Sequence, residues 1–347
     1  MTVGVVIGKF WPPHSGHQAL IDFAYTKVDT VYVLVCSTAT QQPTGRDRAR
    51  WVQQIFPKAE VILTEDFCIW HAPGPCHSEC SAKWARRVSE LVLEPVDAVF
   101  ASESYGDDFG FAMSAPFFSF DPPRTLHPVS GTAVRGDLAS HWNFLHPHVK
   151  TGLCRKVAVM GSESTGTTTL SNHLAQHLGS TCVPEIGRTI SWELMASAGS
   201  MENVEWTPEI FWDILVKHAM SEDYARSIAI QDPPGPSGPW IVADTDALAT
   251  VAWWERYIGE PTPDVRSFSE SRMADAFIIT SPHDVSFHQD GIRDGEDLRF
   301  AMHERFLSLA QASGRPVLLA QGTPNERLTA SILFLNEVNE HHPLFSD

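Results

Sequence analysis

The sequence predicts two consecutive α/β domains, each built around a parallel β-sheet with helices on both faces. The chain has 347 residues, which is roughly twice the usual size of one domain. Short runs of Val, Ile and Leu alternate with segments of helical periodicity, as is typical of parallel sheets covered on both faces. This alternation stops near residue 150 and then starts again, so we expect domains at 1–150 and 153–347.

The first half predicts a series of strands with helices between them. Uninterrupted aliphatic runs indicate strands at 3–8, 30–37, 59–64 and 97–102. Apolar residues at helical spacing indicate helices at 17–28, 46–56 and 81–94. Ligands of such sheets bind beyond the carboxyl ends of the strands. The residues that follow the first strand are therefore the first place to look for a site.

The second half repeats the same pattern after a break at "SHWNFLHPHVKTGLCRK". Strands are expected at 156–161, 181–183, 240–244, 276–280 and 316–320, with a helix at 167–178 and further helical segments up to about residue 230. The Pro- and Gly-rich stretch "DPPGPSGP" separates those helices from the strand at 240–244.

Charge and composition exclude several classes of partner. The formal net charge is −17, which repels the phosphate backbone of DNA, although a few cations in one cleft still suffice for a small anion. No apolar run is long enough to span a membrane, and the N-terminus lacks the features of a signal peptide. We therefore expect a cytoplasmic protein with no DNA and no membrane partner. The oligomeric state leaves no readable mark in the sequence.

The six cysteines do not suggest a disulfide framework in a cytoplasmic chain of this length. Three of them stand with two histidines in "CIWHAPGPCHSEC": Cys68, His71, Cys76, His77 and Cys80. These are zinc-ligand types, but their spacing matches no common zinc motif. A metal site and a simple loop with reduced thiols both remain open.

The stretch "GKFWPPHSGH" follows the first strand and opens the first helix. His14 and His17 are three residues apart, so they share one face of the first helical turn. That turn carries unpaired backbone N–H groups and the positive end of the helix dipole. Gly8 permits close approach of a ligand, and Lys9 adds a cation. Together these features predict a polyphosphate site.

This stretch resembles the first signature of the nucleotidyltransferase superfamily, G-x-F-x-P-x-H-x-G-H. A second stretch, "VSGTAVRGD", is similar to the later motif I-S-[SG]-T-x-[IV]-R of the same superfamily. The order of the two motifs and the segments between them look like the NMN adenylyltransferase domain of NadR-type proteins, over most of residues 3–148. The resemblance implies a Rossmann-like nucleotidyltransferase domain.

In that family, AMP is transferred from ATP to nicotinamide mononucleotide (NMN), giving NAD and pyrophosphate, with Mg²⁺ on the triphosphate. The phosphate of NMN is itself the nucleophile, so the protein only aligns the substrates and neutralises charge. Either NMN or its deamidated form fits the motifs. The resemblance assigns catalysis to His14, His17 and Arg135. It assigns nucleotide binding to Gly8, Lys9, Phe10, Arg48, Ser102, Glu103, Ser130, Gly131 and Thr132.

A second glycine-rich loop, "GSESTGTTT", opens the second domain. Gly161, Gly166 and Thr168 stand where the phosphate-binding P-loop motif G-x-x-x-x-G-K-[ST] requires them, but position 167 is Thr167 instead of lysine. The backbone N–H groups still suit phosphates, while the cation that reaches the β- and γ-phosphates is missing. Arg155 and Lys156 lie at the start of the preceding strand, too far away to replace it. An arginine from a lid is the remaining source.

The rest of this half resembles the ribosylnicotinamide kinase domain of NadR-type proteins, which implies a P-loop kinase-like α/β fold. The carry-over to phosphate binding covers Gly161, Ser162, Glu163, Ser164, Thr165, Gly166, Thr167, Thr168 and Thr169. For substrate or lid contacts it covers Glu185, Arg188, Asp244, Asp246 and Arg293, with Thr168 and Asp244 as the residues that hold Mg²⁺. The implied ligands are ATP and nicotinamide riboside.

Three interpretations of the second domain remain open at this point. It is a kinase of nicotinamide riboside with a cation supplied from elsewhere, a nucleotide-binding regulatory domain that has lost its chemistry, or a kinase of another small substrate. Some NadR-type proteins also carry an N-terminal helix-turn-helix that represses transcription. This sequence starts directly at its first strand, so we expect no such module in it.

Overall fold

The computed structural model describes residues 1–65, 78–283, 285–293 and 296–347. The chain divides into two compact units, Met1–Leu153 together with Pro343–Asp347, and Cys154–His342. The C-terminal segment thus belongs to the first unit, in contrast to the predicted range 153–347. The reason is local pairing: Gln42 and Ser346 form an antiparallel bridge, and the Gln41 amide donates a hydrogen bond to Asp347 at 2.8 Å.

The first unit contains one parallel sheet of strand order β3-β2-β1-β4-β5. Its elements are β1 (Val3–Gly8), α1 (Ser15–Tyr25), β2 (Thr30–Ser37), α2 (Gly45–Ile55), β3 (Glu60–Glu65), α3 (Ser78–Leu91), β4 (Ala98–Ala101), α4 (Gly106–Met113), β5 (Phe117–Ser119), α5 (Gly131–Gly136), η1 (Trp142–Phe144) and α6 (Pro147–Leu153). The strands and helices predicted from the periodicity are all present, while α4, β5 and α6 are additions.

Neighbouring residues of β1 point to opposite faces of this sheet, because side chains alternate along a strand. Val6 packs with Ile21 of α1 and Val52 of α2 in one core. Val5 packs with Val88 of α3 and with Phe109 in a second core. Helices therefore cover both faces, which is why the strand reads as a continuous aliphatic run.

The second unit also contains one parallel sheet, of order β10-β9-β6-β8-β7. Its elements are β6 (Arg155–Met160), α7 (Thr167–Leu178), β7 (Cys182–Val183), α8 (Ile186–Ala198), η2 (Met201–Asn203), α9 (Pro208–Ala229), β8 (Trp240–Asp244), α10 (Ala247–Tyr257), α11 (Pro263–Ser271), β9 (Ala276–Thr280), η3 (Glu296–Leu298), α12 (Arg299–Ala312), β10 (Val317–Ala320) and α13 (Pro324–His341).

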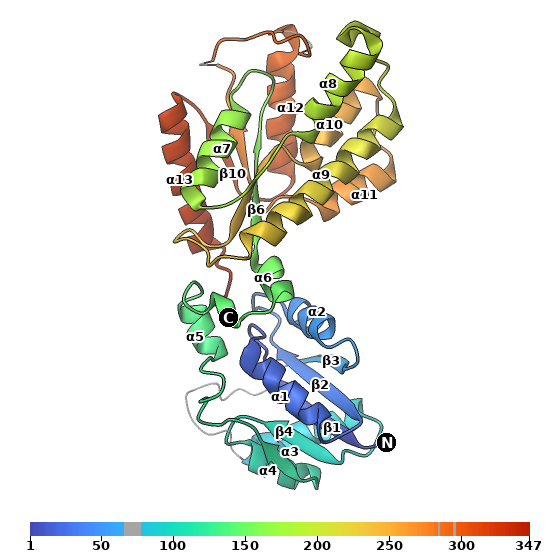
Figure 1. Cartoon of the computed structure of the whole chain (residues 1–347), viewed down its shortest axis with the longest axis vertical. Coiled ribbons are helices and arrows are strands. Elements are labelled where there is room, and N and C mark those ends of the chain that lie inside the picture. Colours follow the sequence, from blue (N-terminus) through green and yellow to red (C-terminus); the bar gives the residue numbers. More distant parts are fainter. Residues whose placement is uncertain (66–77, 284, 294–295) are drawn as a thin grey trace. The chain divides into compact units, whose positions relative to one another are not determined.

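Helices cover both faces of this sheet as well (Figure 1). Val159 of β6 packs with Leu174 of α7 and Leu335 of α13. On the other face, Met160 packs with Ala252 of α10 and with residues of α12. Two parallel α/β units confirm the predicted fold class. In the described part of the chain, no helix combines the length and apolar character needed to cross a membrane.

Candidate functional site

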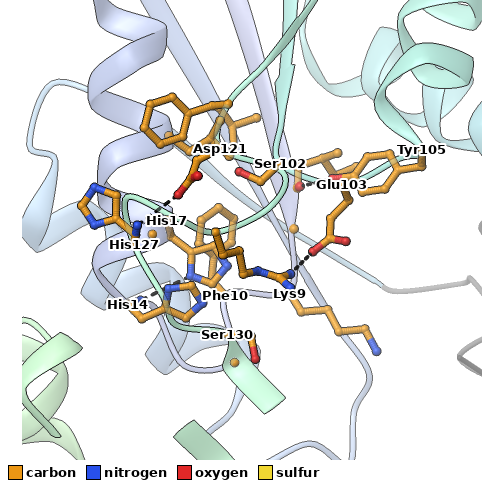
Figure 2. Close-up of a pocket in the computed structure, with 18 of the residues that line it drawn as sticks. Lys9, Phe10, His14, His17, Ser102, Glu103, Tyr105, Asp121, His127 and Ser130 are labelled. Atoms are coloured by element: carbon orange, nitrogen blue, oxygen red, sulfur yellow. Dashed lines mark hydrogen bonds and ion pairs between the residues drawn. The ribbon is translucent and has the colours of Figure 1, made fainter. Parts of the chain in front are cut away.

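The first unit has a cavity of about 320 Å³ beyond the carboxyl ends of β1 and β4. It is lined by the end of β1, the start of α1, residues 102–105 and the segment before α5. Figure 2 shows its labelled polar side chains converging from these elements. Of the residues predicted for this site, the lining includes Gly8, Lys9, Phe10, His14, His17, Ser102, Glu103, Ser130 and Gly131. The sequence motifs and the strand ends therefore meet in one place.

His14 and His17 lie side by side in this cavity, with ring centroids 3.7 Å apart and the ring planes tilted by 32°. The backbone N–H of His14 donates to Nδ1 of His17 at 3.3 Å. Because Nδ1 accepts this bond, the proton of the neutral His17 ring must sit on Nε2. Phe10 supports the ring of His17 from the other side, at 4.8 Å between centroids. The geometry thus leaves His17 Nε2–H as a donor for a ligand.

Both imidazoles are neutral in the free cavity. Burial, helped by the charges of Arg124 and His127, lowers the pKa of His14 to about 3. Burial also lowers the pKa of His17 well below its ordinary value, with smaller contributions from His14 and Arg124. These rings therefore offer phosphate oxygens N–H donors without a fixed positive charge.

The segment between β5 and α5 contributes cavity residues that the sequence motifs did not single out. Asp121 accepts backbone N–H groups of Thr125, Leu126 and His127 at 2.8 to 3.0 Å. This fixes the turn that carries Arg124 and His127 into the cavity. Arg124 forms an ion pair with Glu103 at 2.5 Å. The sequence could have indicated these residues, because the turn that carries them directly precedes the "VSGTAVR" motif.

Ser130 and Gly131 reach the cavity, but Thr132 and Arg135 are not among the described residues that line it. The Arg135 guanidinium lies 4.0 Å from the ring of Trp11. It donates to the Trp11 carbonyl at 2.7 Å and to Thr132 Oγ1 at 3.3 Å. In this geometry Arg135 holds the loop between β1 and α1, instead of extending into the cavity.

Arg48 was predicted to lie near the substrate, and the structure corrects this. Its side chain is fully buried. It donates to the Lys9 carbonyl at 2.7 Å, to Gln41 Oε1 at 3.0 Å and to the Ser37 hydroxyl. A buried guanidinium is stable only where its donors are satisfied. Arg48 therefore positions the backbone that follows β1, and it does not line the cavity.

The second unit has its own cavity of about 260 Å³ around the loop between β6 and α7. All of the predicted loop residues line it, from Gly161 to Thr169. Gly166 has a φ of 82°, a conformation that favours glycine, and α7 begins directly after it. Thr165 is held by Thr280, whose hydroxyl donates to Thr165 Oγ1 at 2.7 Å. The loop thus has a rigid support from the neighbouring strand.

As predicted, the two cations at the start of β6 do not replace the missing lysine at position 167. Arg155 donates to Asn339 at 3.0 Å. Lys156 is fully buried, where it pairs with Glu222 and donates to the Arg272 carbonyl at 2.5 Å. The charged groups of Arg155 and Lys156 are therefore already bonded to other residues of the second unit.

Arginines from other segments approach the loop instead. Arg293 donates to the Ser164 hydroxyl at 2.7 Å and lines the cavity. Arg299 donates to the Ser164 carbonyl at 3.0 Å. Arg188 also lines the cavity and pairs with Asp290, which lies 3.5 Å from Arg293. Arg293, the arginine that the sequence suggested for this position, is therefore in contact with the loop between β6 and α7.

Two acidic residues, Glu185 and Asp244, also line this cavity. Burial, reinforced by the charge of Asp244, raises the pKa of Glu185 to about 7. Thr168 Oγ1 donates to Asp244 Oδ2 at 2.6 Å. The other oxygen of Asp244 is buried and has no hydrogen-bond partner among the described residues. A hydroxyl and a carboxylate with a spare oxygen are hard donors that fit Mg²⁺.

Asp246 was predicted as a substrate or lid residue, and the structure corrects this as well. It is fully buried and does not line the cavity. Its Oδ1 accepts the backbone N–H groups of Leu248 and Ala249 at 2.9 and 3.3 Å, so it caps α10. N-capping is the ordinary structural role of an aspartate at such a position.

An aromatic end of the second cavity was missed by the sequence analysis. Trp206, Phe211, Trp253 and Tyr257 line it. Trp206 and Tyr257 stack with centroids 4.9 Å apart. These residues come from three separate segments, and their apolar spacing alone does not distinguish a ligand pocket from a core.

The cysteine and histidine cluster falls largely outside the described residues, because Cys68, His71, Cys76 and His77 lie in 66–77. Cys80 is described and is buried, and it forms no disulfide with another described cysteine. In the part of the chain that the structure describes, no group of three or more His, Cys, Asp or Glu residues is arranged to hold a metal ion.

The chain is similar to known proteins over most of its length. The AAA domain family matches residues 156–327. The trifunctional NAD biosynthesis/regulator protein NadR of Escherichia coli K12 is 27% identical over 311 residues, covering 84% of this chain and 72% of that protein. The protein of the same name from Salmonella typhimurium is 26% identical, covering 84% and 71%.

Two solved structures share the fold. A NadR protein in complex with NAD and AMP-PNP has a TM-score of 0.63 at 18% identity, covering 96% of both chains. A NadR protein in complex with NR has a TM-score of 0.62 at 19% identity, covering 99% of this chain and 96% of that chain.

Proposed function

Because the chain is homologous to the NadR proteins, we propose that its first unit is an adenylyltransferase of NAD biosynthesis. A phosphate oxygen of NMN attacks the α-phosphorus of ATP and forms a new P–O bond. The bond between the α-phosphorus and the bridging oxygen breaks, and pyrophosphate leaves. No protein nucleophile is required, so the residues act by alignment and by donation to phosphate oxygens.

The observation that carries this proposal is the histidine pair at the start of α1. His17 Nε2–H is a preorganised donor, since Nδ1 is already occupied by the His14 backbone N–H at 3.3 Å. Lys9 and Arg124 supply positive charge at the same cavity, and Ser130 and Gly131 add the start of α5. Mg²⁺ carried by ATP neutralises part of the triphosphate charge. NMN, NAD and ATP are thus the proposed ligands of the first unit.

For the second unit we propose phosphorylation of nicotinamide riboside. A hydroxyl oxygen of the riboside attacks the γ-phosphorus of ATP, ADP leaves, and the hydroxyl proton passes to the Glu185 carboxylate. A carboxyl with a pKa of about 7 is suited to accept a proton near neutral pH. Thr168 and Asp244 hold Mg²⁺, and Arg293 supplies the cation at the phosphate loop.

The alternative for the second unit is a nucleotide-binding regulatory domain without chemistry. Thr167 in place of the loop lysine favours this alternative. The NadR proteins with bound AMP-PNP and with bound NR are consistent with either role, because a bound ligand does not distinguish catalysis from regulation.

A product analysis with purified protein separates these proposals. ATP, Mg²⁺ and NMN should yield NAD and pyrophosphate, and ATP, Mg²⁺ and nicotinamide riboside should yield NMN followed by NAD. Conversion of NMN alone would establish the first activity and leave the second unit as a regulatory binding domain. Conversion of neither would contradict both proposals. Replacing NMN with its deamidated form shows which nucleotide is preferred.

A further inference from the structure

One histidine of the second cavity has no part in the proposed chemistry. Phe211, Ile214 and His218 line the cavity from α9, at positions i, i+3 and i+7 of one helix face. The first two are apolar, so His218 is the polar residue that this face presents. It is only 2% exposed. Such a ring has little access to water, so its nitrogens depend on protein or ligand partners.

The inner partner of His218 lies one helical turn further along α9. Nε2 of His218 is 3.3 Å from Oε1 of Glu222. That carboxylate pairs with the buried ammonium of Lys156. Burial alone would raise the pKa of Glu222, but the neighbouring His218 and Lys156 outweigh it and lower the pKa to about 2.

The contact with Glu222 favours one tautomer of His218. The 3.3 Å separation lacks hydrogen-bond geometry, but an ionised carboxylate this close to Nε2 disfavours a lone pair there, so the proton of the neutral ring belongs on Nε2. Nδ1 then carries the lone pair. Glu222 is itself held by Lys156, which also donates to the Arg272 carbonyl at 2.5 Å. The buried pair thus favours Nδ1 as the acceptor.

The position of His218 along the cavity indicates which ligand group it meets. Phe211 belongs to the aromatic end, where it lies 5.4 Å from Trp206 between ring centroids. His218 is seven residues further along the helix, about 10 Å at the usual rise. His218 lines the same cavity as Asp244, which accepts a hydrogen bond from Thr168 at the start of α7. A flat ring at the aromatic end therefore leaves the sugar of a riboside beside His218.

We propose that His218 is a specificity-determining residue of the second cavity, whose Nδ1 accepts a hydrogen bond from a sugar hydroxyl of the riboside. Glu222, backed by Lys156, is a positioning residue that fixes the tautomer. Phosphate oxygens carry no donor for Nδ1 at neutral pH, whereas each sugar hydroxyl does. This inference rests on the proposal that the second unit binds nicotinamide riboside.

The test is a set of binding titrations at pH 8 with the full chain. The ligands are nicotinamide riboside, its 2′-deoxy and 3′-deoxy derivatives, and the riboside of nicotinic acid. The variants are His218→Phe, which removes the acceptor, and His218→Asn, whose side-chain oxygen can stand near the position of Nδ1. His303→Phe is the matched control, because His303 is buried to a similar extent (3% exposed) and does not line this cavity.

The wild type should bind one deoxy derivative about 10 to 100 times more weakly than the riboside. The reason is that this derivative lacks the hydroxyl that donates to His218, which leaves Nδ1 buried without a donor. His218→Phe should bind the riboside as weakly as that derivative, so that the discrimination disappears, and His218→Asn should retain part of it. His303→Phe should keep the wild-type ratios. In ¹⁵N spectra, Glu222→Gln should shift the His218 tautomer away from Nε2–H.

Two results would overturn the assignment while leaving riboside binding intact. One is a His218→Phe protein that keeps the wild-type ratios for both deoxy derivatives. The other is a change confined to discrimination between the amide and the acid. Failure of the wild type to bind the riboside at all is a different result, because it removes the proposed function of the second unit together with this inference.

Discussion

The two cavities, which we propose both bind phosphate groups, differ in the polar side chains that line them. In the first, buried neutral imidazoles of His14 and His17 stand at the start of α1. In the second, Arg293 contacts the phosphate loop, and Glu185 and Asp244 face it. A transfer between two phosphates needs donors but no proton acceptor, whereas phosphorylation of a hydroxyl needs a group to take the proton. In the first cavity the carboxylates of Glu103 and Asp121 are paired with Arg124 and with backbone N–H groups. In the second, Glu185, with a pKa of about 7, is the group that would take the proton in the proposed phosphorylation.

The largest expected effect separates the two activities at the first cavity. His17→Ala removes the oriented Nε2–H donor and should lower adenylyl transfer by about 10²- to 10³-fold. Phosphorylation of the riboside should not change. His148→Ala is the control, because His148 is an exposed histidine of the same unit. Steady-state rates with ATP and NMN measure the effect, and an active His17→Ala protein would contradict the site assignment.

The second prediction concerns the support of the first cavity. Arg48→Ala strands the Lys9 carbonyl, the Gln41 side chain and the Ser37 hydroxyl in a buried site. The free energy of unfolding should fall by about 2 to 4 kcal/mol. Arg50→Ala on the same helix, where the side chain is 60% exposed, should change it by at most about 0.5 kcal/mol. Urea titrations measure the free energy of unfolding of both variants. Equal decreases for Arg48→Ala and Arg50→Ala would contradict the supporting role of Arg48.

The third prediction examines how the second cavity works with Thr167. Arg293→Ala removes the cation at Ser164 and should lower riboside phosphorylation by about 10- to 100-fold, with NMN adenylylation unchanged. Thr167→Lys restores the usual cation of the loop. Added to Arg293→Ala, it should therefore raise the rate of riboside phosphorylation about tenfold above that of Arg293→Ala alone. Coupled measurement of ADP release follows both variants. If Arg293→Ala is as active as the wild type, the cation comes from another residue.

The smallest expected effect is a pH dependence confined to the first unit. The pKa of His14 is about 3 in the folded chain and 6.5 when unfolded. The unfolded chain therefore binds more protons between these values, and stability falls as the pH decreases through this range. Between about pH 7 and about pH 5.5 the loss should be about 1 kcal/mol from His14. His14→Asn should flatten the curve of unfolding free energy against pH, and an unchanged slope would refute the assignment.

Much of the fold was readable because parallel strands buried on both faces require continuous aliphatic runs. The runs at 3–8 and 156–161 predicted β1 and β6 almost to the residue. The motif residues that follow these two runs have a characteristic spacing, and the structure places both segments at strand ends, each lining a cavity. That they bind phosphates stays a prediction. Short elements such as β5 (Phe117–Ser119) were missed, because three residues carry no periodicity.

The errors in the site concern charged residues whose side chains turn inward. Arg48 and Asp246 stand next to ligand-binding segments in the sequence, but both are fully buried and satisfy backbone groups. Sequence position does not specify the direction of a long or a capping side chain. Asp121 and the aromatic end near Trp206 were missed for the complementary reason, since they reach the cavities from segments distant in the chain.

The sequence by itself determined two parallel α/β units, the loops that follow β1 and β6 and the histidine pair, because each depends on residues that are neighbours along the chain. Only the tertiary structure decided which charges serve the cavities and which serve the core. Lys156 shows why: its partner Glu222 is far away in sequence, and the pairing buries both charges close to His218. Interactions of this kind follow from packing between elements, which local spacing does not encode.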